Sequence, residues 1–479
     1  MSFNSILSSI NDVVWGIPTI LLILATGLVL TIRLRCIQFT HLRRGFRSIF
    51  RKREGAEGEV SAFAALCTAL SATIGTGNIV GVATAIAAGG PGALFWMWIA
   101  AILGTATKFT ECMLACKFRE VKEDGHILGG PFYTIERGMG SKWKWLAKLF
   151  AFFAVAAGLL GIGTMTQING ITTAINNAFD PTNTNIAFRL FDQNYSWATV
   201  IGGALVTIFV ALVILGGLKR IAKVSEVVVP FMAAIYLFLG LSVLVMNATK
   251  IPGAFVTIFQ GAFGMKAVAG GAMGFVVKQM LDAMQKGTAR GIFSNEAGLG
   301  SAPIAACSAQ MNDPVEQGLV NMTGTVIDTL IICTMTGLSI VIAGEGIWGN
   351  PNLQGIVLTT AAFSKVLGGD GHSVQFLLMV CLVFFAFTTI LGWDYYSERC
   401  LEYLTGGRMK IVGVFRILYI VAIAIGPYMT ISAVWTIADI TNGLMAIPNC
   451  VSLIVLSGLA ARHTKDYLTR YPTFESEEE

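Results

Sequence analysis

The stretch from Leu70 to Gly92 is apolar enough to lie in a membrane, but its centre, Gly75-Thr76-Gly77-Asn78, is a poor helix former. Two glycines, a β-branched threonine and an asparagine are each worse than alanine inside a helix. Backbone N–H and C=O groups that leave a helix inside a bilayer are costly unless protein or a polar cavity satisfies them. The pattern therefore predicts a broken helix whose free backbone groups bind a small polar ligand.

Such a break offers partial charges of both signs. The half-helix that starts at Thr76, Gly77 and Asn78 presents free N–H groups at the positive end of its dipole, which suit an anion such as a carboxylate. The half-helix that ends at 71–74 presents free carbonyls, which suit a small cation. The alternative is that the two glycines only allow helices to pack closely.

A second glycine-rich interruption, Gly270-Gly271-Ala272-Met273-Gly274, lies in the apolar span predicted at 263–285. Interrupted spans at corresponding positions of two halves are the best sequence indication of a binding site at the membrane midplane. The second break therefore adds residues to the predicted substrate site: Gly271, Met273, Gly274 and Phe275. The pocket walls are predicted to come from bulky residues close to the breaks: Gln167, Met273 and Phe275.

Polar side chains inside other spans extend both predicted sites. Gln167 lies in the span at 148–175 and Gln279 follows the second break, so each amide either contacts the ligand or only joins helices. The adjacent hydroxyls of Thr388 and Thr389 stand in an apolar span and can supply hard oxygen ligands for Na⁺. Taken alone, this pair is better explained by hydroxyls that bond back to their own helix.

Ionisable residues inside spans are functional candidates by default. Asp328 is the deepest of them, whereas Asp282 and Asp394 fall near span ends. Lys108 and Glu111 are three residues apart, so they are predicted to form a structural ion pair on one helix face. The polar, glycine-rich segment 290–300 is predicted to be an inner loop that serves as a gate or as a linker.

The elements that must position these residues are apolar helices. The chain has 479 residues, of which 54% are hydrophobic and 13% charged, against about 25% charged in soluble domains. We predict an all-α polytopic membrane protein with eleven transmembrane helices of about 20 residues each. Lysine and arginine are concentrated in alternate loops, so the positive-inside rule places the N-terminus outside and the C-terminus in the cytoplasm.

Eleven spans divide into one peripheral helix and ten core helices, which we interpret as a 5+5 inverted repeat. The predicted divisions are a peripheral helix with a basic loop, two five-helix repeats and a cytoplasmic tail: 1–58, 59–250, 251–461 and 462–479. Enzyme signatures of the P-loop, zinc-protease and serine-hydrolase types do not occur in the sequence. A channel would need a repeated filter or charged ring, which the sequence also lacks. We therefore expect a cation-coupled carrier of a small anion or zwitterion, and no enzyme.

The segment from Gly89 to Gly104, GGPGALFWMWIAAILG, resembles the signature of the sodium:alanine symporter family, the alanine or glycine:cation symporters. The stretches GTGNIVGVATAI, QMLDAMQKGTARGIFSNEAGLGSAP and NGLMAIPN are similar to the same family, so the resemblance covers residues 60–450. It implies a leucine-transporter-like fold, in which the first core helix reads GxGNxxxxP near its break. Here the GxGN part is present and Ala83 stands in place of the proline.

The resemblance implies sodium-coupled symport of alanine and glycine across the cell membrane by alternating access. The backbone N–H groups of Thr76 and Gly77 would hold the substrate carboxylate. The implied sodium ligands are two carbonyls and two hydroxyls: Ser71, Ile74, Thr388 and Thr389. The Thr73 carbonyl and the Asn78 side chain fall where some relatives hold a second Na⁺, and Asn78 is equally a candidate to bind substrate. The alternative is a proton-coupled carrier that uses Asp328. The expected partners are the amino acid, sodium and membrane lipid, without nucleic acid.

Overall fold

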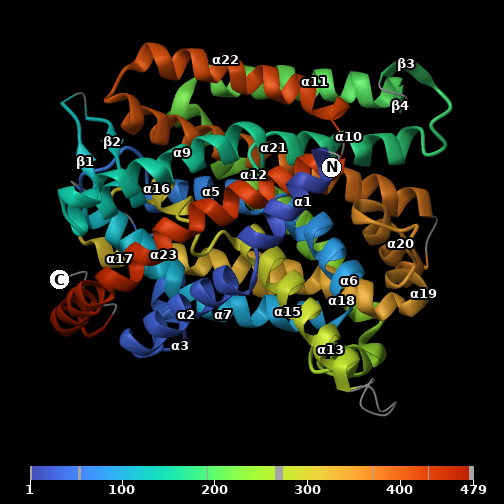
Figure 1. Cartoon of the computed structure of the whole chain (residues 1–479), viewed down its shortest axis with the longest axis horizontal. Coiled ribbons are helices and arrows are strands. Elements are labelled where there is room, and N and C mark those ends of the chain that lie inside the picture. The colour runs from blue at the N-terminus through green and yellow to red at the C-terminus, as the bar shows by residue number, and fades with distance from the viewer. Residues whose placement is uncertain are drawn as a thin grey trace.

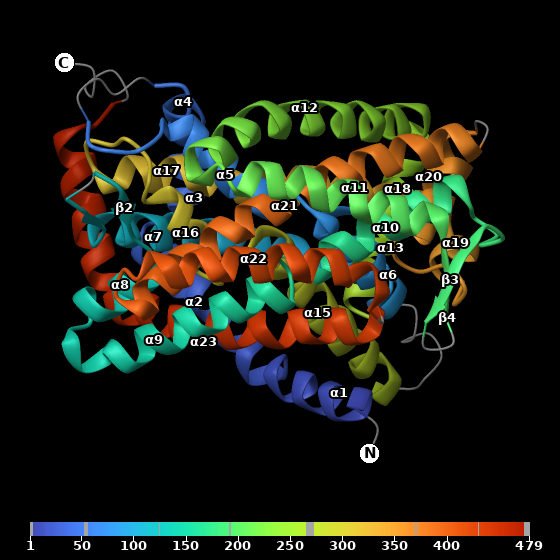
Figure 2. The ribbon, with the colours of Figure 1, turned by 90° about the horizontal axis from the view of Figure 1, so that it is seen from above.

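The computed structural model describes residues 3–51, 56–123, 125–190, 193–264, 273–368, 371–429 and 431–473. This part of the chain is almost entirely helical, and several of the longer helices run side by side along the long axis of the molecule (Figure 1). The view from above shows α22 and α23 beside α9, with the N-terminal helix α1 at one edge (Figure 2).

Short π-helical or 3₁₀-helical segments are labelled η. The first elements are α1 (Phe3–Val14), α2 (Ile17–Arg33), α3 (Ile37–Thr40), α4 (Leu42–Ser48), α5 (Ala62–Thr73), η1 (Gly77–Gly81), α6 (Val82–Gly89), α7 (Gly92–Lys117), β1 (Glu120–Val121), β2 (Ile127–Leu128), α8 (Pro131–Tyr133), η2 (Thr134–Gly138) and η3 (Ser141–Trp143). They are followed by α9 (Lys144–Leu160), α10 (Met165–Phe179), β3 (Ile186–Leu190), β4 (Gln193–Ser196), α11 (Trp197–Ile214), α12 (Gly217–Met246), η4 (Ala248–Lys250) and α13 (Ile251–Ala262).

The remaining elements are α15 (Met273–Asn295), α16 (Ala302–Ala306), α17 (Pro314–Thr325), η5 (Val326–Cys333), α18 (Thr334–Ala343), α19 (Glu345–Trp348), α20 (Gly355–Leu367), α21 (Gly371–Thr405), α22 (Met409–Ile425), η6 (Gly426–Tyr428) and α23 (Ile431–Arg470). The strands form two small antiparallel hairpins, β1 with β2 and β3 with β4. Helices therefore carry the whole architecture.

Among the described residues, nine helices are long and apolar enough to cross a membrane, and the bent pair Ala62–Thr73 and Gly77–Gly89 makes a tenth span. The prediction of an all-α polytopic membrane protein is confirmed. The one predicted span that is not counted here, 263–285, overlaps α15. That helix is not apolar enough to be counted as a span, because it carries four charged residues: Lys278, Asp282, Lys286 and Arg290. The count of eleven therefore stays a prediction.

Local chemistry explains where the helices of the site begin. The Ser61 hydroxyl accepts the Ala64 N–H at 3.1 Å and caps α5. The Asp313 carboxylate accepts the Val315 N–H at 2.8 Å and caps α17, which continues with Pro314 at its first position. Both caps fix the chain just before the helices that enter the centre of the bundle.

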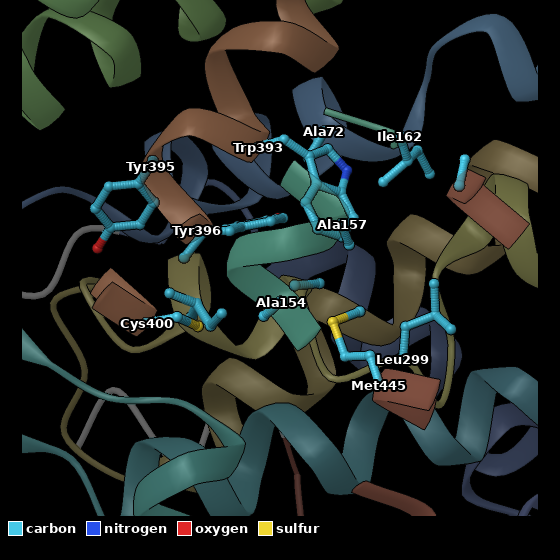
Figure 3. Packing of buried hydrophobic residues seen from close by; sticks show 14 of the residues in the cluster. Ala72, Ala154, Ala157, Ile162, Leu299, Trp393, Tyr395, Tyr396, Cys400 and Met445 are labelled. Carbon is cyan, nitrogen blue, oxygen red and sulfur yellow. The ribbon is translucent and has the colours of Figure 1, made fainter. Parts of the chain in front are cut away.

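Small residues on α9 let α21 approach closely. Figure 3 shows Trp393 and Tyr396 packed near Ala154 and Ala157. A Cβ added at Gly158 would overlap the Ser397 side chain. Trp393, Tyr396 and these alanines belong to one buried apolar cluster, which holds α21 rigidly beside the centre of the molecule.

Candidate functional site

The predicted break at Gly75–Asn78 is present. The α-helix α5 ends at Thr73, Ile74 has an extended backbone, and the chain resumes as the π-helical turn η1 and then α6, bent by 48° from α5. Two of the freed N–H groups meet side-chain amides: Gly75 N–H donates to Asn78 Oδ1 at 2.9 Å, and Thr76 N–H donates to Gln167 Oε1 at 3.1 Å. All of these residues are buried, so the break lies inside the protein, as the bilayer requires.

A second buried break lies at 296–301, between α15 and α16. Glu296, Gly298 and Gly300 have φ angles of +57°, +90° and +80°, a left-handed conformation that stops a helix. Sequence analysis placed an inner loop at 290–300 and the second break at 270–274. Residues 270–272 lie outside the described residues, so the break predicted there stays a prediction, and 273–274 begin α15. The predicted loop is corrected: residues up to Asn295 are helical, and the following turn is buried in the bundle.

Buried carboxylates hold the second break in place. Glu296 accepts the indole N–H of Trp393 at 2.7 Å and the Ser301 hydroxyl at 2.6 Å. Glu111 accepts the Gly298 N–H at 3.2 Å and the Asn449 amide at 3.0 Å. Helices α7, α21 and α23 thus converge on one unwound segment.

Sequence reasoning missed three residues of this arrangement: Glu296, Trp393 and Asn449. A usable signal was present, because an acidic residue beside two glycines within an apolar region needs buried partners.

Asp328 joins the two breaks. Its carboxylate accepts Asn78 Nδ2 at 2.7 Å, Ser294 Oγ at 2.9 Å and Thr329 Oγ1 at 2.6 Å. It lies in the π-helical segment η5, a distortion that is frequent at functional sites. A Cβ added at Gly77 would lie 3.1 Å from Ser294 Cα, so the backbones of the two broken helices touch directly at this level.

A third interruption separates α9 from α10 at 161–164, inside the region predicted as one continuous span at 148–175. Gln167 begins the next turn and is only 1% exposed. Its Nε2 donates to the Ile162 carbonyl at 2.9 Å, while its Oε1 accepts the Thr76 N–H. The structure therefore places Gln167, a predicted substrate residue, beside Thr76. Its amide oxygen bonds directly to the Thr76 N–H.

Both predicted threonines donate to the Phe385 carbonyl of their own helix at 3.0 Å, and Thr389 in addition reaches the first break. Thr389 Oγ1 lies 3.3 Å from the Ile74 carbonyl oxygen and would be 2.4 Å from a Cβ added at Gly75. Thr388 Oγ1 donates to carbonyls of its own helix at 3.0 and 3.1 Å. Ser71 is fully buried, and its hydroxyl bonds to the Thr68 carbonyl of α5. The structure therefore joins Ile74 and Thr389 directly.

The predicted residues around 271–279 lie elsewhere. Gly271 is outside the described residues, whereas Met273, Gly274 and Phe275 form the first turn of α15. At roughly 1.5 Å per residue, that turn is about 30 Å from Ser294 at the other end of the helix. Gln279 is exposed and lines a separate cavity of about 290 Å³ with Asp282 and Glu345. The described residues Met273, Gly274, Phe275 and Gln279 are not brought to Thr76–Asn78.

Three further ionisable residues singled out in the sequence, Lys108, Glu111 and Asp394, are buried. Lys108 and Glu111 form the expected pair, with Nζ and Oε1 3.5 Å apart. Asp394 is fully buried, and neither of its carboxylate oxygens has a hydrogen-bond partner in the described part of the chain.

Polar contacts tie together the bundle end where α5 begins. The Arg119 guanidinium donates to the carbonyls of Glu57, Cys307 and Ala309 at 2.8 to 2.9 Å. The Gln310 N–H donates to the Val60 carbonyl at 2.8 Å. The start of α5 and the segment after α16 can therefore move apart only if these bonds break.

Comparison with known proteins shows the family to which the chain belongs. The model of the sodium:alanine symporter family matches residues 1–478. Sodium/alanine symporter AgcS of Methanococcus maripaludis is 43% identical over 472 residues, which cover 98% of each chain. Putative sodium/proton-dependent alanine carrier protein YrbD of Bacillus subtilis is 36% identical over 477 residues, 96% of this chain and 91% of that protein. The structure of MhsT in complex with L-phenylalanine has a TM-score of 0.55 at 14% identity, covers 86% of this chain and 99% of its own, and shows the leucine-transporter fold. The chain therefore belongs to the sodium:alanine symporter family.

Proposed function

We propose that this protein couples the movement of Na⁺ to the uptake of small neutral amino acids, alanine and glycine, by alternating access. The observation that carries the proposal is the meeting of two buried broken helices, at Gly75–Asn78 and at 296–301. Buried backbone donors at a helix start suit a carboxylate, and carriers place substrate between such half-helices. Membership of the family supports the choice of amino acid and ion.

In this proposal the substrate carboxylate binds the N–H groups of Thr76 and Gly77, beside Asn78. Phe293 borders the same space, because a Cβ at Gly77 would lie 3.3 Å from its ring. In this proposal Phe293 takes the wall position predicted for Met273 and Phe275.

In the proposal the cation binds between the first break and α21. The Ile74 carbonyl and the Thr389 hydroxyl already converge, and oxygen donors of this kind fit a hard cation such as Na⁺. Ser71 and Thr388 complete the proposed set. The Thr73 carbonyl and Asn78 remain the proposed second site, where the Asp328 carboxylate is bonded to Asn78.

The membrane arrangement proposed for this function keeps the N-terminus outside and the C-terminus in the cytoplasm. The first core repeat contains the break at Gly75, and the second contains the break at 296–301. Each break then interrupts its membrane-spanning helix at the depth in the bilayer where Asp328 lies.

The function is tested with purified protein in liposomes that contain no Na⁺. We expect saturable uptake of labelled alanine when Na⁺ is added outside, and no uptake when Li⁺ or a proton gradient replaces it. Uptake driven by a proton gradient alone would instead support the second candidate, a proton-coupled carrier; the buried Asp328 favours that candidate.

The same liposomes test the size of the cargo. Each methylene that a closed pocket excludes costs about 1–3 kcal/mol, so leucine is expected to compete at least tenfold more weakly than alanine. Alanine amide lacks the carboxylate and is expected not to compete. Equal competition by leucine or by the amide would contradict the proposed pocket.

Substituting Thr389 by valine is expected to raise the Na⁺ concentration for half-maximal uptake by about tenfold, the equivalent of about 1.4 kcal/mol. Valine keeps the shape but removes the oxygen that faces Ile74. Thr388→Val is the matched neighbour and is expected to change this concentration less, because its hydroxyl bonds to its own helix. A larger effect at Thr388 would contradict the placement of the cation beside Ile74.

A further inference from the structure

The side-chain amide of Gln167 links the first break, at Gly75–Asn78, to the interruption at 161–164 between α9 and α10. Its oxygen accepts the Thr76 N–H at 3.1 Å, and its nitrogen donates to the Ile162 carbonyl at 2.9 Å. A Cβ added at Gly75 would lie 3.1 Å from the same amide oxygen. One buried group therefore satisfies a free N–H of the first break and a free C=O of the interruption between α9 and α10.

An α-amino acid also carries one hydrogen-bond acceptor and one hydrogen-bond donor close together, on two adjacent carbon atoms. Its carboxylate oxygen accepts a hydrogen bond, and its ammonium donates one, as the carbonyl and NH₂ of a primary amide do. The Thr76 N–H has one hydrogen to donate. A substrate carboxylate at Thr76 and the Gln167 oxygen are therefore mutually exclusive partners.

We propose that Gln167 is an internal substitute for the head group of the substrate, and this inference rests on the proposed function of amino acid symport. Substrate displaces the amide, places its carboxylate on Thr76 N–H and its ammonium on the Ile162 carbonyl. The specificity groups of the site are thus a backbone N–H and a backbone C=O, and Gln167 competes with the substrate for both.

The substitute matters most in the step that returns the unloaded carrier. Closing the site without substrate would leave the Thr76 N–H buried and unpaired and the Ile162 carbonyl with only the Thr166 hydroxyl, 3.3 Å away, and the loss of a buried hydrogen bond is costly for each group. Gln167 removes that cost, so the unloaded site can close. With substrate bound the amide is not needed, and the loaded step proceeds without it.

Gln167→Ala tests the inference, because the two possible roles give effects of opposite sign. As a competitor, Gln167 lowers the apparent affinity in proportion to the fraction of sites it occupies. Its removal is therefore expected to tighten alanine binding about tenfold, the scale of one or two hydrogen bonds. If Gln167 is a direct ligand of substrate, the same change weakens binding, and the inference is overturned.

Transport assays give a second, independent readout. Alanine-for-alanine exchange uses only the loaded carrier, so Gln167→Ala is expected to keep exchange near the parental rate. Net Na⁺-driven uptake is expected to fall about tenfold, because the variant lacks the hydrogen bonds that let the unloaded site close. Equal losses of exchange and net uptake would overturn the inference.

Gln167→Glu keeps the folded shape and places an anion at the Thr76 N–H. It is expected to weaken alanine binding by tenfold or more, since the carboxylate is a stronger competitor for that donor. Tighter binding in this variant would indicate that residue 167 contacts the substrate ammonium, contrary to the inference.

Thr172→Val is the matched control on α10. Its hydroxyl bonds only to carbonyls of its own helix, at 2.9 and 3.3 Å, so affinity, exchange and net uptake are expected to stay parental.

Binding to the parent is first measured with each of the twenty amino acids. A parent that binds another amino acid in place of alanine contradicts the proposed substrate but still tests Gln167 with that ligand. A parent that binds none of them contradicts the head-group inference itself.

Discussion

Replacing Asp328 by alanine is expected to reduce Na⁺-driven alanine uptake at least a hundredfold and to lower the melting temperature of the purified protein. The carboxylate accepts hydrogen bonds from Asn78, Ser294 and Thr329. Its removal takes this acceptor from Thr329 and leaves Asn78 and Ser294 only longer contacts, with the Asp328 carbonyl at 3.3 Å and Cys333 Sγ at 3.2 Å. The loss of these three buried bonds costs about 1–3 kcal/mol each, and a loss of about 2.7 kcal/mol already equals a hundredfold. Uptake into liposomes and thermal unfolding in detergent measure both effects.

Asp328→Asn separates the charge from the shape. The asparagine keeps one oxygen for these donors, so the fold is expected to survive while uptake remains at least tenfold below the parent, about 1.4 kcal/mol. Parental uptake in this variant would show that no negative charge is needed at this position, and it would also remove the proton-coupled alternative.

Replacing Gly77 by valine is expected to abolish uptake. A Cβ there would lie 3.1 Å from Ser294 Cα and 3.3 Å from the Phe293 ring, and the β-branched side chain adds two further carbons in the same crowded place. The contact is between the two broken helices, so the substitution forces them apart and displaces the N–H groups proposed to hold the carboxylate.

The contact with Ser294 adds a packing effect, so a moderately lower folded yield is expected together with the loss of alanine binding. Gly81→Ala is the matched control, because a Cβ there meets only the Thr76 carbonyl, at 3.9 Å. Monodisperse Gly77→Val protein with parental alanine affinity would reject the placement of the carboxylate.

The first break could be predicted because its signal is local. Gly75-Thr76-Gly77-Asn78 contains four residues that each weaken a helix, and they follow an apolar run. The pairing of Lys108 with Glu111 was equally accessible, since both lie one turn apart on one helix.

The second break could not be placed in the same way. Glycines at 270–274 and glycines at 298–300 give the same composition signal, so composition alone does not show that a buried break lies at 296–301. Residues 296–301 are buried because Glu111, Trp393 and Asn449, far apart in the sequence, supply their hydrogen-bond partners. A sequence pattern read along one segment contains no information about such distant partners.

The different roles of Thr388 and Thr389 were also beyond local reasoning. Neighbours on a helix point about 100° apart, so only one of two adjacent hydroxyls can face Ile74. Which one does so is set by the packing of α21 on α5, where a Cβ at Gly392 would overlap Ala72.

The ion pair within α7 has a consequence for the way this chain enters the membrane. A lone ionised residue at the centre of an inserting helix costs about 2.5–3.5 kcal/mol. Lys108 and Glu111 reach the bilayer on the same segment and already face each other, so the pair can partition as an electrically neutral unit before any later helix is synthesised. The second carboxylate oxygen then stays free for Gly298 and Asn449, which leave the ribosome much later.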